Sequence, residues 1–213
     1  MAPGDIITKM NKEFDKSIRH LRMVDPKLAK IIKQAAKPTM IWEKKREPFE
    51  ALCFSIMNQQ LAGAAAAAIY KRFCALYGGK NPTPAQLLKT RLPKLRACGI
   101  SGPKAMYLKD LAKKVSDNSL EIHKLSHLDD EKIIAELTQV KGIGRWTAEM
   151  FLMFTIGRLD VFPVGDLGIR NGMKELYGLK GRVPDEKLVK LAEKWRPYRS
   201  IGSWYIWQYK DGK

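Results

Sequence analysis

Apolar residues recur at helical spacing along much of the chain, and proline and glycine divide this pattern into segments. The most apolar segment, residues 49–77, is rich in alanine, which is the strongest helix former. Pro48 stands where a first helical turn tolerates proline, and Gly78 and Gly79 end the segment. The pattern therefore predicts a long apolar helical stretch between these residues.

Further helices are predicted on both sides of this stretch. Residues 1–46 are polar and basic with spaced apolar positions, which predicts one or two helices with breaks near Pro26 and Pro38. Toward the C-terminus we expect a short helix introduced by Pro82 and Pro84, and helices over residues 103–116, 129–140, 146–156, 166–176 and from Asp185 onward. Alternating β-branched runs, which would indicate strands, are missing. The sequence predicts an all-α protein.

The charge of the chain changes this picture from a helical protein to a candidate nucleic-acid binder. The 213 residues include 39 Lys and Arg against 22 Asp and Glu, a formal net charge of +17 at pH 7. A domain this basic repels itself unless it meets a polyanion, so we expect it to bind a phosphate backbone. The alternative is a basic surface that serves solubility alone.

The spacing of the cysteine and histidine residues argues against both a disulfide framework and a metal site. Cys53, Cys74 and Cys98 lack CxxC spacing, which indicates free thiols in a reducing compartment. His123 and His127 lie four residues apart without further ligands and are expected at the surface. With no apolar signal region and no run of about 18 apolar residues, we expect a soluble intracellular protein without a membrane partner. Its compartment would be the nucleus in a eukaryote and the cytoplasm or nucleoid in a prokaryote.

A glycine hairpin is the strongest local motif. Residues 137–148 read Leu-Thr-Gln-Val-Lys-Gly-Ile-Gly-Arg-Trp-Thr-Ala and place two glycines around one apolar residue, between two amphipathic helices. Glycine permits backbone conformations and close approaches that a Cβ would obstruct. Outward-pointing amides at the start of the second helix then form an anion site for one DNA phosphate. The candidate phosphate-binding residues are Lys141, Gly142, Gly144, Arg145 and Thr147.

The same turn is a candidate cation site. Backbone carbonyls near Val140 and Gly142 are suitable ligands for a monovalent cation, Na+ or K+, and we expect no other cofactor. An ordinary tight turn between helices is the alternative for the whole motif, since Gly-x-Gly alone would make one.

In combination, three parts of the sequence resemble 3-methyladenine DNA glycosylase II, a family of the helix-hairpin-helix superfamily. They are residues 137–166, the upstream Asn58-Gln59-Gln60-Leu61 and the tail 195–200. The larger bacterial members carry an N-terminal β-lobe for which this chain has no room, so it is similar to the compact all-helical members. The resemblance implies one domain of two helical lobes, about 46–125 and 1–45 with 126–213, and a DNA-binding and active-site cleft between them.

The resemblance assigns Asp166, 20 residues after Trp146, as the catalytic carboxylate. Breaking an N-glycosidic bond builds positive charge on the deoxyribose, and an adjacent carboxylate stabilises that charge and positions or activates water. One carboxylate suffices when alkylation has already made the leaving base cationic. The alternative is that Asp166 only caps its helix. Asp160 lies off the matching position and is expected to form a structural ion pair.

A nucleotide must leave the duplex stack to reach such a carboxylate. The resemblance places the wedge that fills the gap at Gln60 and Leu61, in an exposed loop after a helix, where Leu61 offsets part of an unstacking cost of roughly a few kcal/mol. A core leucine is the alternative. The compact members often have histidine after this leucine, whereas this chain has Ala62, which weakens that DNA contact.

The resemblance also implies an electron-rich pocket, because cation–π contact with an alkylated base contributes about 0.5–2 kcal/mol. Trp146 and Trp207 match the pocket positions of the family, and Met150 stands where larger members can have an aromatic residue. Trp42, Trp195 and Trp204 are expected to pack in the core.

Trp146 also bears on the type of reaction. The related endonuclease III branch has lysine at this position, which forms a Schiff base with the sugar, and a four-cysteine cluster that this chain lacks. The nearest lysine of the hairpin is Lys141, so β-lyase activity is not expected. We expect a monomeric, monofunctional glycosylase that releases 3-methyladenine and 7-methylguanine from damaged duplex DNA in base excision repair. The alternatives are a catalytically weak or inactive homologue that binds abasic or distorted DNA, and a general DNA-binding module that does not need Asp166.

Overall fold

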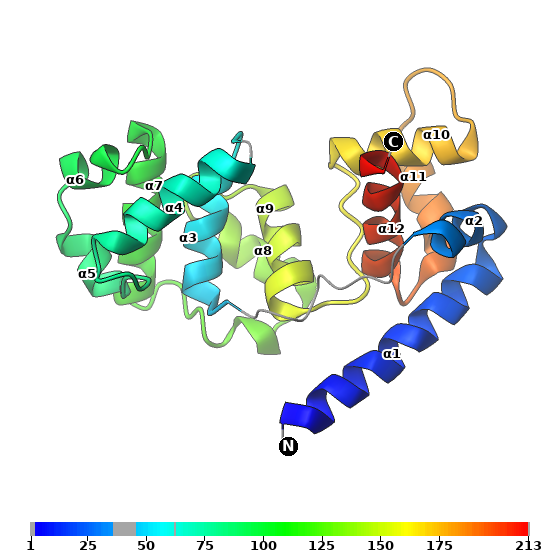
Figure 1. The fold of residues 1–213 in the computed structure, drawn as a ribbon, viewed down its shortest axis with the longest axis horizontal. Helices are drawn as coiled ribbons and strands as arrows, with labels where there is room; N and C mark the ends of the chain where they lie inside the picture. The colour runs from blue at the N-terminus through cyan, green and yellow to red at the C-terminus, as the bar shows by residue number, and fades with distance from the viewer. Residues whose placement is uncertain (1–2, 36–45, 62, 213) are drawn as a thin grey trace. The chain divides into compact units, whose positions relative to one another are not determined.

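A computed structural model describes residues 3–35, 46–61 and 63–212, and the regular elements within these ranges are all helices (Figure 1). The all-α prediction is confirmed. The predictions for Pro38, Trp42 and Ala62 concern residues outside the described ranges. No helix among the described residues is long and apolar enough to cross a membrane.

Two compact units divide the chain by their internal packing. The central unit is Lys44–Ile156, and the terminal unit combines Met1–Glu43 with Gly157–Lys213. The hairpin groups with the central unit, whereas the resemblance implies that residues 126–213 group with the N-terminal segment. The difference arises because the helices on either side of the hairpin pack on one another, and the second also packs on the helix after Pro48.

The central unit is built from short helices, four of which have proline at their first or second position. Its helices are α3 (Pro48–Asn58), α4 (Gly63–Ala75), α5 (Pro84–Lys89), α6 (Leu92–Ala97), α7 (Gly102–Ser116), α8 (Asp130–Thr138) and α9 (Arg145–Phe151), which continues as a π-helix over Leu152–Ile156. Leu52, Phe73 and Leu108 are fully buried in its core. The predicted stretch 49–77 is thus two helices, and α6 was not predicted.

The terminal unit joins the two ends of the chain. Its helices are α1 (Pro3–Val24), α2 (Pro26–Gln34), α10 (Leu167–Tyr177), α11 (Asp185–Ala192) and α12 (Arg199–Asp211). The predicted break at Pro26 is confirmed, since Asp25 ends α1 and caps α2 by accepting hydrogen bonds from the amides of Lys27 and Leu28. Helix α12 packs on α2 and α10.

A buried hydrogen-bond network fastens these two ends together. The Asp25 side chain is 1% exposed and lies 3.1 Å from the Lys194 ammonium. It also accepts hydrogen bonds from the Tyr177 hydroxyl and, at 2.8 Å, from the Trp195 indole. Burial alone would raise the pKa of Asp25, but these donors outweigh it and hold the pKa below its usual value.

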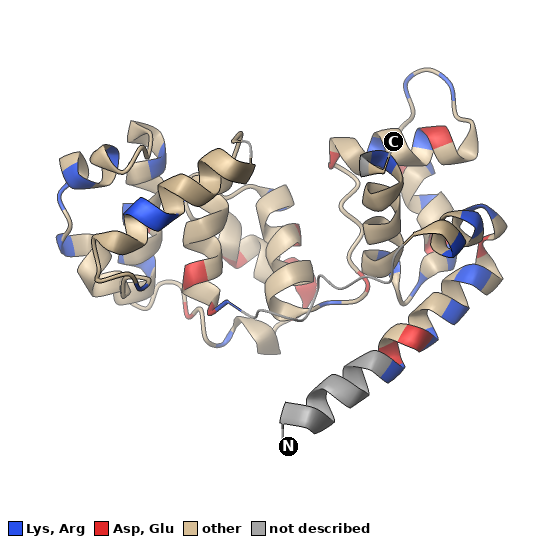
Figure 2. Ribbon diagram, viewed as in Figure 1, with Lys and Arg blue, Asp and Glu red and all other residues tan. Residues whose placement is uncertain are grey.

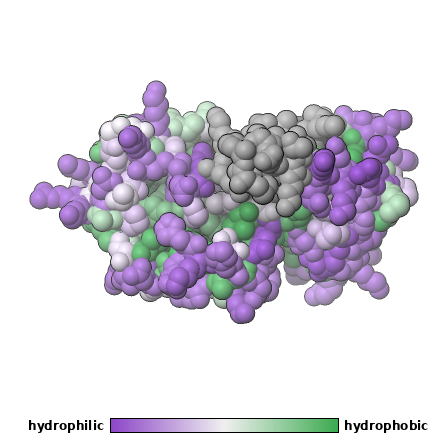
Figure 3. All heavy atoms as spheres, turned by 90° about the horizontal axis from the view of Figure 1, so that it is seen from below, coloured by the Kyte–Doolittle hydropathy of each residue, from purple (hydrophilic) through white to green (hydrophobic). Residues whose placement is uncertain are grey.

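Basic side chains are spread over both units. Figure 2 shows Lys and Arg along α1 and α2 and on the helices α4 to α7. On the face drawn in Figure 3, hydrophilic side chains predominate and apolar ones lie scattered among them. This charge distribution fits the expected affinity for a phosphate backbone.

Candidate functional site

The hairpin between α8 and α9 adopts the conformation that its glycines predict. Gly142 has φ +81°, in the left-handed region, and a Cβ at this position would lie 2.1 Å from the ring of Tyr107. Ile143 is 4% exposed and packs inward, and Val140 is 1% exposed. Gly142 is therefore required twice, by its backbone angle and by the close approach of an aromatic ring.

The second glycine has a different environment. Gly144 is the N-cap of α9, with ordinary extended backbone, and a Cβ built there meets no atom within 4 Å. Lys141 at the same turn is exposed, while its amide donates a 2.9 Å hydrogen bond to Asp110. The surface around Gly144 is thus open to a ligand, with the exposed Lys141 nearby in the turn.

Two other predicted phosphate-binding residues are placed less favourably for that task. Thr147 is 4% exposed, so its side chain is shielded from the surface. The Arg145 guanidinium hydrogen-bonds to both carboxylate oxygens of Glu131, and its Nε lies 3.1 Å from Glu149. The hydrogen bond from Arg145 holds the pKa of Glu131 below its usual value. Arg145 is therefore engaged with two carboxylates; Glu149 lies one helical turn away in the sequence, whereas local spacing could not reveal Glu131, on the preceding helix.

The carbonyls proposed for a monovalent cation already accept hydrogen bonds. The Val140 carbonyl accepts from the amide of Ile143 at 3.0 Å, and the Gly142 carbonyl accepts from the Gln59 side-chain amide at 2.8 Å. Among the described residues there is also no group of three or more His, Cys, Asp or Glu placed to hold a metal ion. A cation at the turn would have to share both carbonyls with these donors.

The predicted wedge lies in the loop between α3 and α4. Gln60 has φ +56°, a left-handed conformation that is uncommon outside glycine and turns the chain sharply after α3. Leu61 is 37% exposed, so it is not a core leucine. The Gln59 amide that reaches Gly142 ties this loop to the hairpin.

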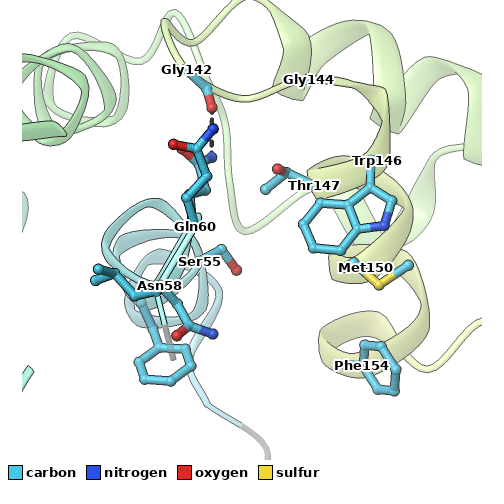
Figure 4. A pocket seen from close by; sticks show the side chains of 12 residues that line it. Ser55, Asn58, Gln60, Gly142, Gly144, Trp146, Thr147, Met150 and Phe154 are labelled. Atoms are coloured by element: carbon cyan, nitrogen blue, oxygen red, sulfur yellow. Dashed lines mark hydrogen bonds between the residues drawn. The ribbon is translucent and has the colours of Figure 1, made fainter. Parts of the chain in front are cut away.

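A pocket of about 680 Å³ lies in the central unit between this loop, α3 and α9 (Figure 4). Trp146, Met150 and Phe154 follow one another at four-residue spacing along one side, and Trp146 is 45% exposed. The opposite side carries polar groups, Ser55 and Asn58. The complete lining is Phe54, Ser55, Asn58, Gln59, Gln60, Leu61, Gly142, Gly144, Trp146, Thr147, Met150 and Phe154.

Several of these lining residues were not among the predicted site residues. Phe154 could have been found by extending the spacing of Trp146 and Met150 by one turn. Ser55 and Asn58 could have been found because they lie one turn apart, directly before the predicted wedge. The pattern alone does not say which face of α3 lines a pocket and which packs in the core.

Asp166, in the terminal unit, is half-buried and is the N-cap of α10. Its Oδ1 accepts a 2.9 Å hydrogen bond from the Ile169 amide and another of 2.9 Å from the Trp207 indole. A Cβ on Gly168 would come within 3.1 Å of both side chains, so a glycine lets the indole approach the carboxylate. The helix cap is confirmed, and it fixes the carboxylate in one orientation.

Four other predicted residues belong to this unit, namely Asp160, Trp195, Trp204 and Trp207. Trp207 lies with Asp166 in the terminal unit, whereas Trp146 and Met150 line the pocket of the central unit. Asp160 forms the expected structural ion pairs, with Arg196 and Arg199. Core packing is confirmed for Trp195 and Trp204, which are 0% and 4% exposed.

The hairpin between α8 and α9, followed by Asp166 at the start of α10, agrees with the resemblance of the sequence to helix-hairpin-helix glycosylases. Residues 53–197 match the HhH-GPD superfamily of base excision DNA repair proteins, and the chain belongs to this superfamily.

Individual relatives and structures agree with this assignment. DNA-3-methyladenine glycosylase 1 of Schizosaccharomyces pombe is 36% identical over 209 residues, which cover 96% of this chain and 89% of the relative. The alkylbase DNA glycosidase-like protein mag2 of the same yeast is 31% identical and covers 93% of this chain and 94% of its own. The structure of the S. pombe 3-methyladenine DNA glycosylase Mag1 in complex with abasic DNA superposes with a TM-score of 0.81 at 35% identity, over 92% of this chain and 97% of that one.

Proposed function

We propose that this protein is a monofunctional DNA glycosylase that hydrolyses the N-glycosidic bond of alkylated purines, 3-methyladenine and 7-methylguanine among them, in duplex DNA. The observation that carries the proposal is the fixed Asp166 carboxylate, whose Oδ1 accepts hydrogen bonds from Ile169 and Trp207. The relatives named as 3-methyladenine glycosylases support the substrate class.

In the proposed reaction Asp166 faces the sugar of an extruded nucleotide. As the C1′–N bond breaks, its electron pair leaves with the base, and the negative charge of Asp166 stabilises the positive charge on the deoxyribose. Asp166 also positions the water that attacks C1′ and takes up the proton that this water loses. The alkylated base is cationic and leaves without protonation. The indole of Trp207 keeps the carboxylate from turning away, so little reorganisation is needed as charge develops.

The central unit would bind the DNA. Amides at Gly144 and the charge of Lys141 hold one phosphate, Leu61 fills the gap in the stack, and Trp146 presents its ring to the cationic base. The bound Na+ or K+ at the hairpin stays a prediction. Monomeric action and an intracellular location, where DNA is found, are part of the same proposal.

Asp166→Asn is the decisive variant, because asparagine caps helices as well as aspartate and still accepts hydrogen bonds, but lacks the charge. We expect wild-type protein to release methylated bases from alkylated duplex DNA and the variant to be slower by at least ~100-fold in single-turnover assays. Thermal melting of both proteins is the control for folding. Equal rates would remove Asp166 from the mechanism.

Two further outcomes of the same assay separate the alternatives. Tight binding to abasic DNA without any base release by the wild type would indicate a homologue that binds DNA without catalysis. One relative is named only as glycosidase-like, which is consistent with this alternative. Adding borohydride tests for a Schiff base with the sugar. We expect no trapped adduct, because Trp146 occupies the position at which the endonuclease III branch has its lysine nucleophile.

A further inference from the structure

One face of α7 contacts both the wedge loop and the hairpin. Lys104, Tyr107 and Asp110 are spaced three residues apart, so they follow one another along the same side of the helix. Each of them touches a backbone segment that belongs to the proposed DNA-binding surface. All the segments concerned lie within the central unit.

Lys104 holds the end of α3. Its ammonium donates hydrogen bonds to the carbonyls of Met57, at 3.0 Å, and of Gln59. The last carbonyls of a helix lack intrahelical donors and carry partial negative charge, so a cation there satisfies and stabilises them. Burial lowers the pKa of Lys104 below its usual value. Directly beyond this clamp the chain takes the left-handed turn at Gln60.

Tyr107 and Asp110 hold the hairpin. The ring of Tyr107 occupies the space that a Cβ on Gly142 would fill. The Asp110 carboxylate accepts a 2.9 Å hydrogen bond from the backbone amide of Lys141. The Gln59 side chain donates a hydrogen bond to the Gly142 carbonyl and so links the wedge loop directly to the hairpin. The wedge loop and the phosphate-binding turn are therefore set against the same helix.

We infer that Lys104 is a positioning residue for base extrusion: it fixes the wedge loop at a set distance from the phosphate-binding hairpin, with α7 as the common support. The inference rests on the proposed function, since it takes Leu61 as the wedge. Extrusion needs the wedge to enter the stack at a defined offset from the anchored phosphate, and a small displacement of reacting groups costs a large factor in rate.

Helix α7 itself offers a matched control. Lys109 is also half-buried, also has a pKa lowered by burial, and donates a 2.6 Å hydrogen bond to the Leu88 carbonyl at the end of α5. Replacing either lysine with methionine removes one positive charge and one clamp on a helix end. Only the helix end that Lys104 contacts is followed by the wedge loop, the segment between α3 and α4 that carries Gln60 and Leu61.

The experiment compares Lys104→Met, Lys109→Met, Lys104→Arg and Leu61→Ala. Stack disruption is read from 2-aminopurine fluorescence beside a tetrahydrofuran abasic analogue, and chemistry from single-turnover release of 7-methylguanine. We expect both Lys104→Met and Leu61→Ala to lose most of the fluorescence change. Lys104→Met should also release the base about tenfold more slowly than the wild type. Lys109→Met should match the wild type in both readouts, and Lys104→Arg should recover most of them. Both methionine variants should lose equal affinity for undamaged duplex.

The inference is overturned if Lys104→Met and Lys109→Met behave alike in the fluorescence assay. If Lys104→Met does not fold, Lys104→Gln and Lys109→Gln take the place of the methionine variants, since glutamine removes the charge and keeps a polar end; equal fluorescence changes in these two variants overturn the inference as well. The fluorescence arm needs no catalysis. Absence of base release by the wild type would therefore reject the proposed function while leaving the role of Lys104 to be decided by extrusion.

Discussion

Gly142 and Gly144 flank the same isoleucine, but different requirements make them glycine. Gly142 needs its positive φ and has the Tyr107 ring against it, whereas a Cβ on Gly144 would point into open space. The first glycine serves the fold of the hairpin. The second leaves room for something outside the chain, and a phosphate at the start of α9 is the ligand that the hairpin suggests.

Alanine substitutions should separate these two requirements. We expect Gly142→Ala to lower the free energy of unfolding by at least ~2 kcal/mol, through backbone strain and collision with Tyr107. Gly144→Ala should change it by less than ~1 kcal/mol but weaken DNA binding. Urea denaturation and fluorescence anisotropy with a duplex measure the two effects. Similar losses of stability in both variants would contradict this division.

At the scale of elements, sequence patterns predicted where helices occur better than where they break. The break between α3 and α4 includes Gln60 with a left-handed φ, directly after the Gln59 carbonyl that accepts a hydrogen bond from the distant Lys104, and no local pattern shows that contact. The predicted helix 146–156 is similarly interrupted, since it becomes a π-helix at Leu152. Such insertions are frequent at functional sites, and here the π-helix carries Phe154 to the pocket.

The row of Trp146, Met150 and Phe154 gives a prediction for this element. Trp146→Ala should still fold, because Trp146 is 45% exposed. We expect its release of cationic 7-methylguanine to fall about 3- to 30-fold, through loss of cation–π contact. Trp146→Phe keeps an aromatic face and should retain most of the rate, whereas Trp146→Leu should not. Single-turnover rates of these variants measure this, and equal rates for the Phe and Leu variants would indicate that Trp146 acts by shape and not by its π electrons.

At the scale of the whole molecule, hydrogen bonds and an ion pair join the N-terminal helices to the C-terminal part of the chain within the terminal unit. The all-α class and, except for α6, the order of the helices followed from the sequence, as did the hairpin and the position of Asp166 at the start of α10. The grouping of residues 126–156 did not, because helical periodicity gives the buried face of a helix without naming its neighbour. The Asp25 network was also beyond prediction, since its partners Tyr177 and Trp195 lie 152 and 170 residues away.

Asp25 should make stability depend on pH. Its native carboxyl binds a proton less tightly than the unfolded one, because the pKa is lowered by folding. The contribution is therefore fully present well above the ordinary aspartate pKa of about 3.9 and is lost as the pH falls below it. We expect Asp25→Asn to be less stable by about 3 kcal/mol at pH 7. Urea denaturation at pH 7 and near pH 3 tests this, and a difference that does not shrink at low pH would contradict it.

The discontinuous terminal unit has a consequence for synthesis of the chain. Domains fold as their residues leave the ribosome, and α1 and α2 emerge long before their partners in α10 and α12. The central unit, with its hairpin and pocket, is complete by residue 156. A product that terminates before Trp207 would keep the proposed DNA-binding surface but lack the indole that holds Asp166. Helix α12, which carries Trp207, is thus the element that would turn a DNA-binding chain into a hydrolase.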